Sequence, residues 1–245
     1  MNQNYNKRMN RIIIVPDVHG RSFWRDLLTN KEDHIIFLGD YSDPYSFEGL
    51  VHKDALRELS DIIQFKKENS TRVILLWGNH DLSYLDPRFR CCRYSSIHAV
   101  QFKNIYQDNF DLFQVAADCE INSKRYLFTH AGVNNGWISH NRKNMVQNDP
   151  LAMLKRSFDE KPILWSQVSE WRGGDYEWGS PVWADLNEHD SDGAFPNLIQ
   201  IFGHSMQDEH PEINGRMWCV DCKKIFVLEK GELREYAKKT LILEN

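Results

Sequence analysis

Seven polar side chains that can bind metals or transfer protons occur in five short motifs along the 245-residue sequence. They are Asp17, His19, Asp40, Asn79, His80, His130 and His204. The set mixes carboxylate, imidazole and amide groups, which suit manganese, iron or zinc better than an all-oxygen calcium or magnesium site. The residue types therefore indicate a site for divalent transition-metal ions. Manganese is the first expectation, with iron or zinc as alternatives.

Each motif lies at the end of a short apolar run rich in Ile, Val, Leu and Phe. The runs cover residues 12–15, 35–38, 73–77, 126–128 and 198–202. Runs this short are typical of strands that are covered on both faces. Helical patterns at 22–28 and 53–67 separate the first three runs, which predicts parallel strands with right-handed crossovers. Because ligand sites in open α/β sheets form at the carboxyl ends of strands, we expect the motifs to converge there.

The pattern changes after Met217. Apolar runs at 218–221, 224–228 and 233–236, with a turn at Lys230-Gly231, predict a meander of strands. The fold class is therefore α/β and layered, with a mixed sheet or two packed sheets. No repeat or low-complexity linker divides the chain, so we expect a flexible polar N-terminus at 1–10 and a single domain at 11–245.

Composition argues against several classes of protein. The formal net charge is −5 and no block of Lys or Arg stands out, so general nucleic-acid binding is not expected. The polar N-terminus contains no signal-like apolar run, and no later stretch approaches the length of a membrane span. Five cysteines, an odd and low count, fit a reducing compartment. We therefore expect a cytoplasmic protein without a membrane partner.

The ordered motifs resemble those of the calcineurin-like metallophosphoesterase superfamily, and within it the serine/threonine protein phosphatase branch with its bacterial relatives. The blocks that carry the resemblance are D-V-H-G at 17–20, G-D-Y-S-D at 39–43, G-N-H-D at 78–81, H-A-G at 130–132 and G-H at 203–204. The resemblance implies an α/β/β/α sandwich, in which a central pair of mixed β-sheets is flanked by helices. It also implies a dinuclear metal centre.

In the family pattern each metal has its own ligands and one carboxylate bridges both. The first metal would be held by Asp17, His19 and Asp40. The second would be held by Asp40, Asn79, His130 and His204, with Asp40 as the bridge. Many superfamily members carry a second His in the last block, where this chain has Met206, so a water would take that place on the first metal.

The resemblance implies hydrolysis of a phosphomonoester, on a phosphoprotein or a small molecule. A hydroxide that bridges two cations, about 3.5–4 Å apart, would attack phosphorus. His80 would protonate the leaving group as general acid, and Asp43 would orient His80. Two alternatives stay open: a dinucleoside polyphosphate or phosphodiester hydrolase, and a non-catalytic scaffold. The scaffold ranks last, because scaffold relatives would be expected to lose the acid or a ligand, and this chain keeps them all.

The residues that would grip the phosphate are the least defined. The protein phosphatase branch usually has arginines where this chain has Pro44 and Trp77. Arg21 and Arg172 are the predicted substrate-binding residues in their place. Other candidates are Arg88, Arg90 and Arg93, and for each arginine a solvated surface role is the competing interpretation.

Two further features have open interpretations. Four tryptophans between Trp165 and Trp183 could form an aromatic lid over the site, or a self-packed loop that covers the sheet edge, which we favour. The C-x-x-C at Cys219 and Cys222 lacks the further ligands that a zinc site needs, so we interpret both cysteines as packing residues.

Overall fold

The computed structural model describes residues 11–27, 33–89, 91–144 and 149–236. The predicted flexible N-terminus, residues 1–10, and the candidate Arg90 lie outside these ranges. Within them, no helix is both long and apolar enough to cross a membrane.

Two mixed β-sheets form the centre of the molecule. The six-stranded sheet has the order β11-β10-β1-β2-β3-β4, with β1 to β4 parallel and β10 antiparallel to β1. Its strands are β1 (Arg11–Val15), β2 (His34–Phe37), β3 (Val73–Leu76), β4 (Phe113–Gln114), β10 (Phe226–Glu229) and β11 (Glu232–Glu235). The five-stranded sheet has the order β5-β6-β7-β9-β8. Its strands are β5 (Ala117–Ile121), β6 (Lys124–Phe128), β7 (Leu198–Phe202), β8 (Glu212–Asn214) and β9 (Met217–Cys219).

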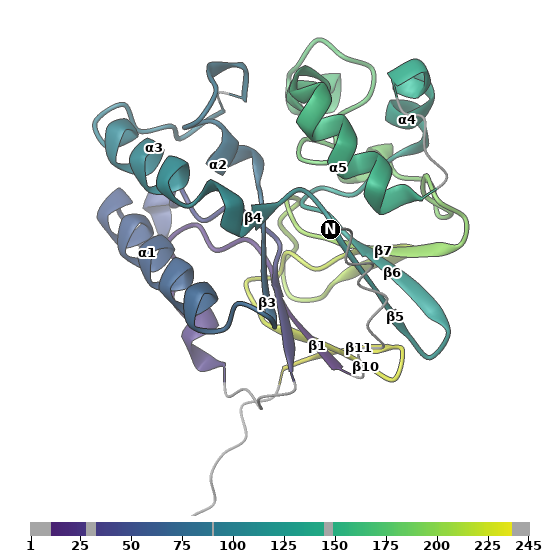
Figure 1. The fold of residues 1–245 in the computed structure, drawn as a ribbon, viewed down its shortest axis with the longest axis horizontal. Coiled ribbons are helices and arrows are strands. Elements are labelled where there is room, and N and C mark those ends of the chain that lie inside the picture. Colours follow the sequence, from purple (N-terminus) through teal and green to yellow (C-terminus); the bar gives the residue numbers. More distant parts are fainter. Residues whose placement is uncertain (1–10, 28–32, 90, 145–148, 237–245) are drawn as a thin grey trace, which may run out of the picture.

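Helices flank both sheets (Figure 1). The helices α1 (His52–Glu68) and α3 (Ala99–Asp108) lie on the side of the six-stranded sheet, and α4 (Asn135–Asn141) and α5 (Pro150–Glu160) lie on the side of the five-stranded sheet. A short helix, α2 (Asn79–Leu82), follows β3 directly. The predicted α/β/β/α sandwich is confirmed. The predicted helix at 53–67 is α1, whereas the one at 22–28 is only a 3-10 turn at Phe23–Asp26, and its last residue, Leu28, lies outside the described ranges.

Alternating side chains of the inner strands pack on opposite faces of the six-stranded sheet. Ile13, Ile35 and Phe37 belong to the core beneath the helices. Ile12, Ile14 and Ile36 belong to the core between the two sheets, where they meet residues of β5, β6 and β7. A strand alternates its side chains between faces, so runs without polar residues are what burial on both faces requires.

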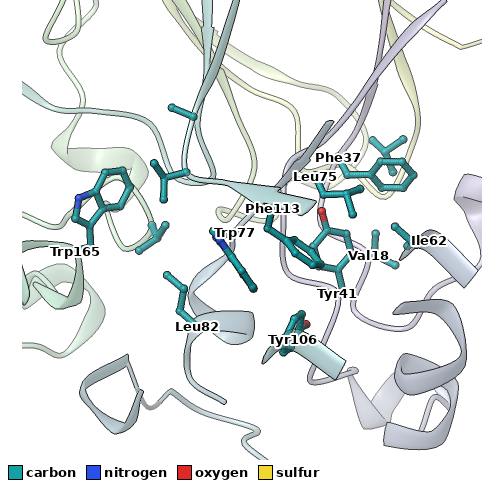
Figure 2. Close-up of a cluster of buried hydrophobic side chains, with 14 of the residues drawn as sticks. Val18, Phe37, Tyr41, Ile62, Leu75, Trp77, Leu82, Tyr106, Phe113 and Trp165 are labelled. Atoms are coloured by element: carbon teal, nitrogen blue, oxygen red, sulfur yellow. The ribbon is translucent and has the colours of Figure 1, made fainter. Parts of the chain in front are cut away.

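An aromatic cluster packs beneath the loops that follow β2 and β3 (Figure 2). The ring of Trp77 stacks on Phe113 with centroids 4.2 Å apart, and Tyr41 and Tyr106 each contact Phe113 edge-on at 5.7 Å. Tyr41 follows Asp40 in the chain, and Trp77 precedes Gly78. Trp77 is therefore a buried anchor for a loop and lies away from solvent.

The predicted C-terminal meander is only partly right. β10 and β11 form the expected hairpin, in which Phe226 pairs with Glu235 and Glu229 with Glu232. β9 instead pairs with β7 in the other sheet. The loop after β9 crosses between the sheets, because Val220 and Cys222 are buried in the core that lies between them.

Candidate metal centre

The predicted ligands come from segments that follow the carboxyl ends of five strands in both sheets, with Asn79 at the start of α2. Asp17, Asp40 and Asn79 follow β1, β2 and β3, and His130 and His204 follow β6 and β7. The Oδ2 atom of Asp40 lies 3.4 Å from His19 Nε2 and 3.5 Å from His130 Nε2. Since this oxygen stands between two imidazoles from opposite sheets, Asp40 is the central carboxylate of the group.

The other donor atoms gather around the same two imidazoles. His130 Nε2 lies 3.0 Å from Asn79 Oδ1 and 3.1 Å from His204 Nδ1. On the other side, His19 Nε2 lies 3.9 Å from Asp17 Oδ2. The six predicted ligands thus form two adjoining groups that share Asp40.

Unusual backbone conformations aim these side chains. His19, Asp40 and His204 have φ values of 45°, 53° and 66°, in the left-handed region that non-glycine residues rarely adopt. Such conformations carry strain and cluster at functional sites. Two glycines admit the carboxylates: a Cβ on Gly78 would lie 2.1 Å from Asp40 Oδ1, and one on Gly203 would lie 2.2 Å from Asp17 Oδ1.

The hydrogen bonds of His19 and His130 leave the Nε2 atoms of both rings facing Asp40. His19 Nδ1 lies 2.8 Å from the carbonyl oxygen of Ser42, and His130 Nδ1 lies 2.8 Å from that of Leu38. A carbonyl only accepts, so each Nδ1 carries a hydrogen, and in the neutral form of each ring Nε2 presents a lone pair toward Asp40. Lone pairs that converge on a carboxylate repel one another unless a cation lies between them. The donor set therefore fits bound cations.

The pKa shifts of the site residues also indicate a place for cations. Burial acts to lower the pKa of His130, but the charges of Asp40 and Asp17 raise it to about 9. Burial and the charge of Asp221 raise the pKa of Asp17 well above its usual value. Burial would also raise the pKa of Asp40, but the neighbouring imidazoles of His130 and His80 lower it well below that value. The pocket thus holds negative charge that positive charge stabilises.

His80 lies beside this group with its ring held by Asp43. His80 Nδ1 is 2.8 Å from Asp43 Oδ2, and both side chains are buried. The hydroxyl of Tyr84 donates to Asp43 Oδ1, and the backbone N–H of His80 donates to Asp40 Oδ1 at 3.0 Å. The carboxylate accepts from Nδ1, so Nε2 is the ring atom available to a ligand.

The two arginines predicted to bind substrate are engaged in ion pairs. Arg21 Nε and Nη2 lie 2.7 and 3.0 Å from the two carboxylate oxygens of Glu48, and Nη1 donates to the carbonyl of Asp17 at 3.3 Å. Arg172 Nε lies 2.7 Å from Asp185 Oδ2, and its Nη2 donates to the Ser205 hydroxyl. Substrate binding by Arg21 stays a prediction, and its bidentate pair with Glu48 argues against it.

Sequence reasoning gave no role to two acidic residues of the site. Asp81 accepts hydrogen bonds from the backbone N–H groups of Asp40, Tyr41 and Gly78, at 2.8, 2.9 and 3.0 Å. It therefore ties the loop after β2 to the loop after β3. Asp221 is buried near Asp17 and Arg21, and burial raises its pKa to about 6 although Arg21 opposes this. In the sequence Asp221 lies inside the C-x-x-C at Cys219 and Cys222, where a single aspartate forms no motif of its own.

The tryptophan-rich segment is mostly packed. Trp165 is fully buried, with the edge of its ring against Trp137 and Phe158, and Trp183 is buried beside His204. Trp171, by contrast, is 64% exposed. Cys219 and Cys222 are buried, and Cys219 Sγ donates to the carbonyl of Ser205 at 3.2 Å.

Comparisons with known proteins agree with this architecture. A cold-active protein tyrosine phosphatase superposes with a TM-score of 0.61 at 15% identity, covering 93% of this chain and 78% of that one. A protein tyrosine phosphatase from a psychrophilic Shewanella species gives 0.58 at 16% identity, covering 93% and 80%. A serine/threonine phosphatase from Saccharomyces cerevisiae gives 0.49 at 16% identity, covering 92% and 74%. No curated protein sequence matches the chain.

The sequence itself also matches a family. The model of the calcineurin-like phosphoesterases matches residues 10–208, which include all five motifs. The two protein tyrosine phosphatase structures share the fold at low sequence identity. The chain therefore belongs to the calcineurin-like phosphoesterase family.

Proposed function

We propose that this protein is a dinuclear metal-dependent phosphatase that hydrolyses phosphomonoesters. The observation that carries the proposal is the position of Asp40 Oδ2, 3.4 Å from His19 Nε2 and 3.5 Å from His130 Nε2. A carboxylate between two such imidazoles is suited to bridging two cations. Family membership supports phosphoester hydrolysis as the reaction class.

The proposed ligands follow the two groups of donor atoms. One metal would be held by Asp17, His19 and Asp40, and the other would be held by Asp40, Asn79, His130 and His204. Manganese is proposed as the metal, with iron or zinc as alternatives, because imidazole and carboxylate ligands are mixed. When bound, two such cations would activate a water molecule and neutralise phosphoryl oxygens.

His80 is proposed as the general acid. Its Nδ1 is engaged by Asp43, so Nε2 is the atom that would give a proton to the leaving oxygen. Asp43 would stabilise the charged ring and keep it in place, and the Tyr84 hydroxyl on the other carboxylate oxygen would fix Asp43. Arg172 stays a proposed phosphate contact on the side of His204. Burial lowers the pKa of His204, and the nearby charge of Arg172 lowers it further, so the guanidinium lies close to this imidazole.

Metal analysis together with a substrate panel tests this proposal. Protein purified without chelator is expected to carry close to two transition-metal ions per chain. With manganese added, it should hydrolyse p-nitrophenyl phosphate faster than bis(p-nitrophenyl) phosphate or diadenosine tetraphosphate. A preference for either of the latter two would favour the diester or polyphosphate alternative. Metal content near zero, with no hydrolysis after manganese is added, would contradict the proposal and favour a scaffold.

A further inference from the structure

The guanidinium of Arg93 reaches the centre of the site from a loop that follows α2. Its Nη2 lies 3.2 Å from His80 Nε2 and 3.5 Å from His19 Nε2. His80 Nε2 is the atom that would donate the proton, and His19 Nε2 is the atom that would bind a metal. Arg93 is therefore the arginine, among those described, whose charged end lies against both the proposed acid and a proposed metal ligand.

Arg93 is held from several sides. Its Nε donates to the carbonyl of Asp43 at 3.0 Å, and its guanidinium stacks over the ring of Tyr45, 3.8 Å from the centroid. His52 Nε2, at the start of α1, donates to the Arg93 carbonyl at 3.2 Å. The residue adopts a φ of 61°, which is strained for arginine and needs such support. The guanidinium is thus pre-organised, which lowers the entropy that binding would cost.

Among the residues that the structure describes, no carboxylate forms an ion pair with this guanidinium, and its Nη1 lies 3.8 Å from the sulfur of Cys92. The other candidate phosphate contacts that the structure describes each form an ion pair with a carboxylate. They are Arg21, Arg88 and Arg172. The groups that face Arg93 Nη2 are imidazoles, which are neutral or positive in every protonation state and cannot neutralise it. A half-buried guanidinium aimed at uncharged or cationic groups needs an anion in front of it.

We propose that Arg93 binds the phosphoryl oxygens of the substrate and selects phosphomonoesters over diesters. The inference rests on the proposed function. A monoester phosphate carries about −1.5 to −2 charges near neutral pH and exposes three oxygens to such a donor. A diester carries one negative charge, and its second ester group occupies an oxygen that Arg93 would otherwise hold. A planar guanidinium therefore gains more from the monoester, through bidentate charge-assisted hydrogen bonds.

The test compares Arg93→Ala with Arg88→Ala, a matched change in the same loop. Arg88 is exposed and pairs with Asp86, outside the site. Both variants are assayed on p-nitrophenyl phosphate and bis(p-nitrophenyl) phosphate, which share one leaving group. Inhibition by inorganic phosphate and metal content per chain are measured alongside.

Arg93→Ala is expected to lower kcat/KM on the monoester roughly 10- to 100-fold, as for the loss of charge-assisted hydrogen bonds. Inhibition by inorganic phosphate should weaken by a similar factor, the diester should lose much less, and metal content should stay at the wild-type level. Arg93→Lys should recover part of the phosphate affinity, since it keeps the charge but not the planar fork. Arg88→Ala should match wild type.

Two results would overturn the inference. Unchanged inhibition by phosphate would mean that Arg93 acts only by positioning His80. Equal losses on both substrates would mean that it does not select between them.

Tyr45→Phe, which keeps the ring under the guanidinium, should preserve phosphate affinity, whereas Tyr45→Ala should weaken it. Failure of the proposed function looks different, because wild type itself would then lack metals and activity.

Discussion

At the scale of single residues, His80 contacts Asp40 through its backbone N–H and contacts Asp43 through its ring. The His80 N–H donates to Asp40 Oδ1, while its ring turns to Asp43. Removal of the imidazole therefore leaves every proposed ligand side chain in place. This arrangement makes the role of His80 separable from metal binding by experiment.

Replacing His80 with Asn is expected to lower kcat by roughly 10²–10⁴-fold, the usual range for a general acid, with both metals retained. The loss should be largest on an alkyl phosphate, whose alkoxide needs a proton, and smaller on p-nitrophenyl phosphate, whose phenolate leaves readily. Steady-state kinetics on both substrates and metal analysis measure this. Loss of a metal, or equal losses on the two substrates, would remove His80 from the acid role.

Asp43→Asn is expected to give a milder loss with the same dependence on the leaving group. The amide keeps the size of the side chain but removes the charge that stabilises the protonated ring of His80. Kinetics on the same two substrates provide the measurement. Asp33→Asn is a suitable control, because Asp33 pairs with Arg11 at the start of β1, away from the site. A loss on both substrates alike would show that Asp43 supports the site in another way.

At the scale of elements, short loops and the one-turn helix α2 present the site. Asp81 in α2 accepts from the N–H groups of the loop after β2, and its Oδ1 also accepts from the hydroxyls of Ser42 and Tyr106. Tyr106 comes from α3 and packs in the aromatic cluster with Trp77. The proposed bridging residue is thus connected to the hydrophobic core through one buried carboxylate.

Asp81→Asn is expected to destabilise the fold by about 1.5–3 kcal/mol, because one carboxylate oxygen becomes a donor and leaves buried N–H groups without acceptors. For a chain of this size that corresponds to a fall in Tm of roughly 3–12 °C. Differential scanning calorimetry without added metal measures it. Asp86→Asn, which affects only an exposed pair with Arg88, should change Tm little. An unchanged Tm in Asp81→Asn would show that the carboxylate does not hold the two loops.

At the scale of the whole molecule, the proposed centre lies across the two sheets. Asp17, Asp40 and Asn79 follow strands of one sheet, and His130 and His204 follow strands of the other. Between the sheets lies a core of aliphatic and aromatic side chains, including Ile14 and Phe128. Metals bound at this edge would link the sheets at their polar end, in addition to the apolar contact.

Removal of metal by a chelator is therefore expected to lower Tm by roughly 10 °C, since a ligand at 1,000 times its Kd adds about 4 kcal/mol to the free energy of unfolding. Adding manganese back should restore Tm in a concentration-dependent way. His80→Asn should show the same response, whereas Asp40→Asn, which removes the proposed bridge, should show a much smaller one. A response that is unchanged in Asp40→Asn would place the metal elsewhere.

The sequence by itself determined the inner strands and the polar groups at their ends. Uninterrupted apolar runs such as 12–15 and 35–38 indicate strands buried on both faces, because a strand alternates its side chains between two cores. The order of Asp17, Asp40 and His130 after such runs then predicted that they would meet, and the structure brings them together. The apolar runs and the polar residues that follow them are local patterns, so a single sequence can show them.

Only the tertiary structure decided how the loops pair. Phe23–Asp26 is a 3-10 turn in which Trp24 and Arg25 both bind Glu58 of α1, a contact that no local pattern reveals. The sequence could not choose among the arginines either. The path of the loops places Glu48 against Arg21 and leaves Arg93 facing two imidazoles. An arginine is positioned by partners that are far away in the chain, and those partners are set by packing.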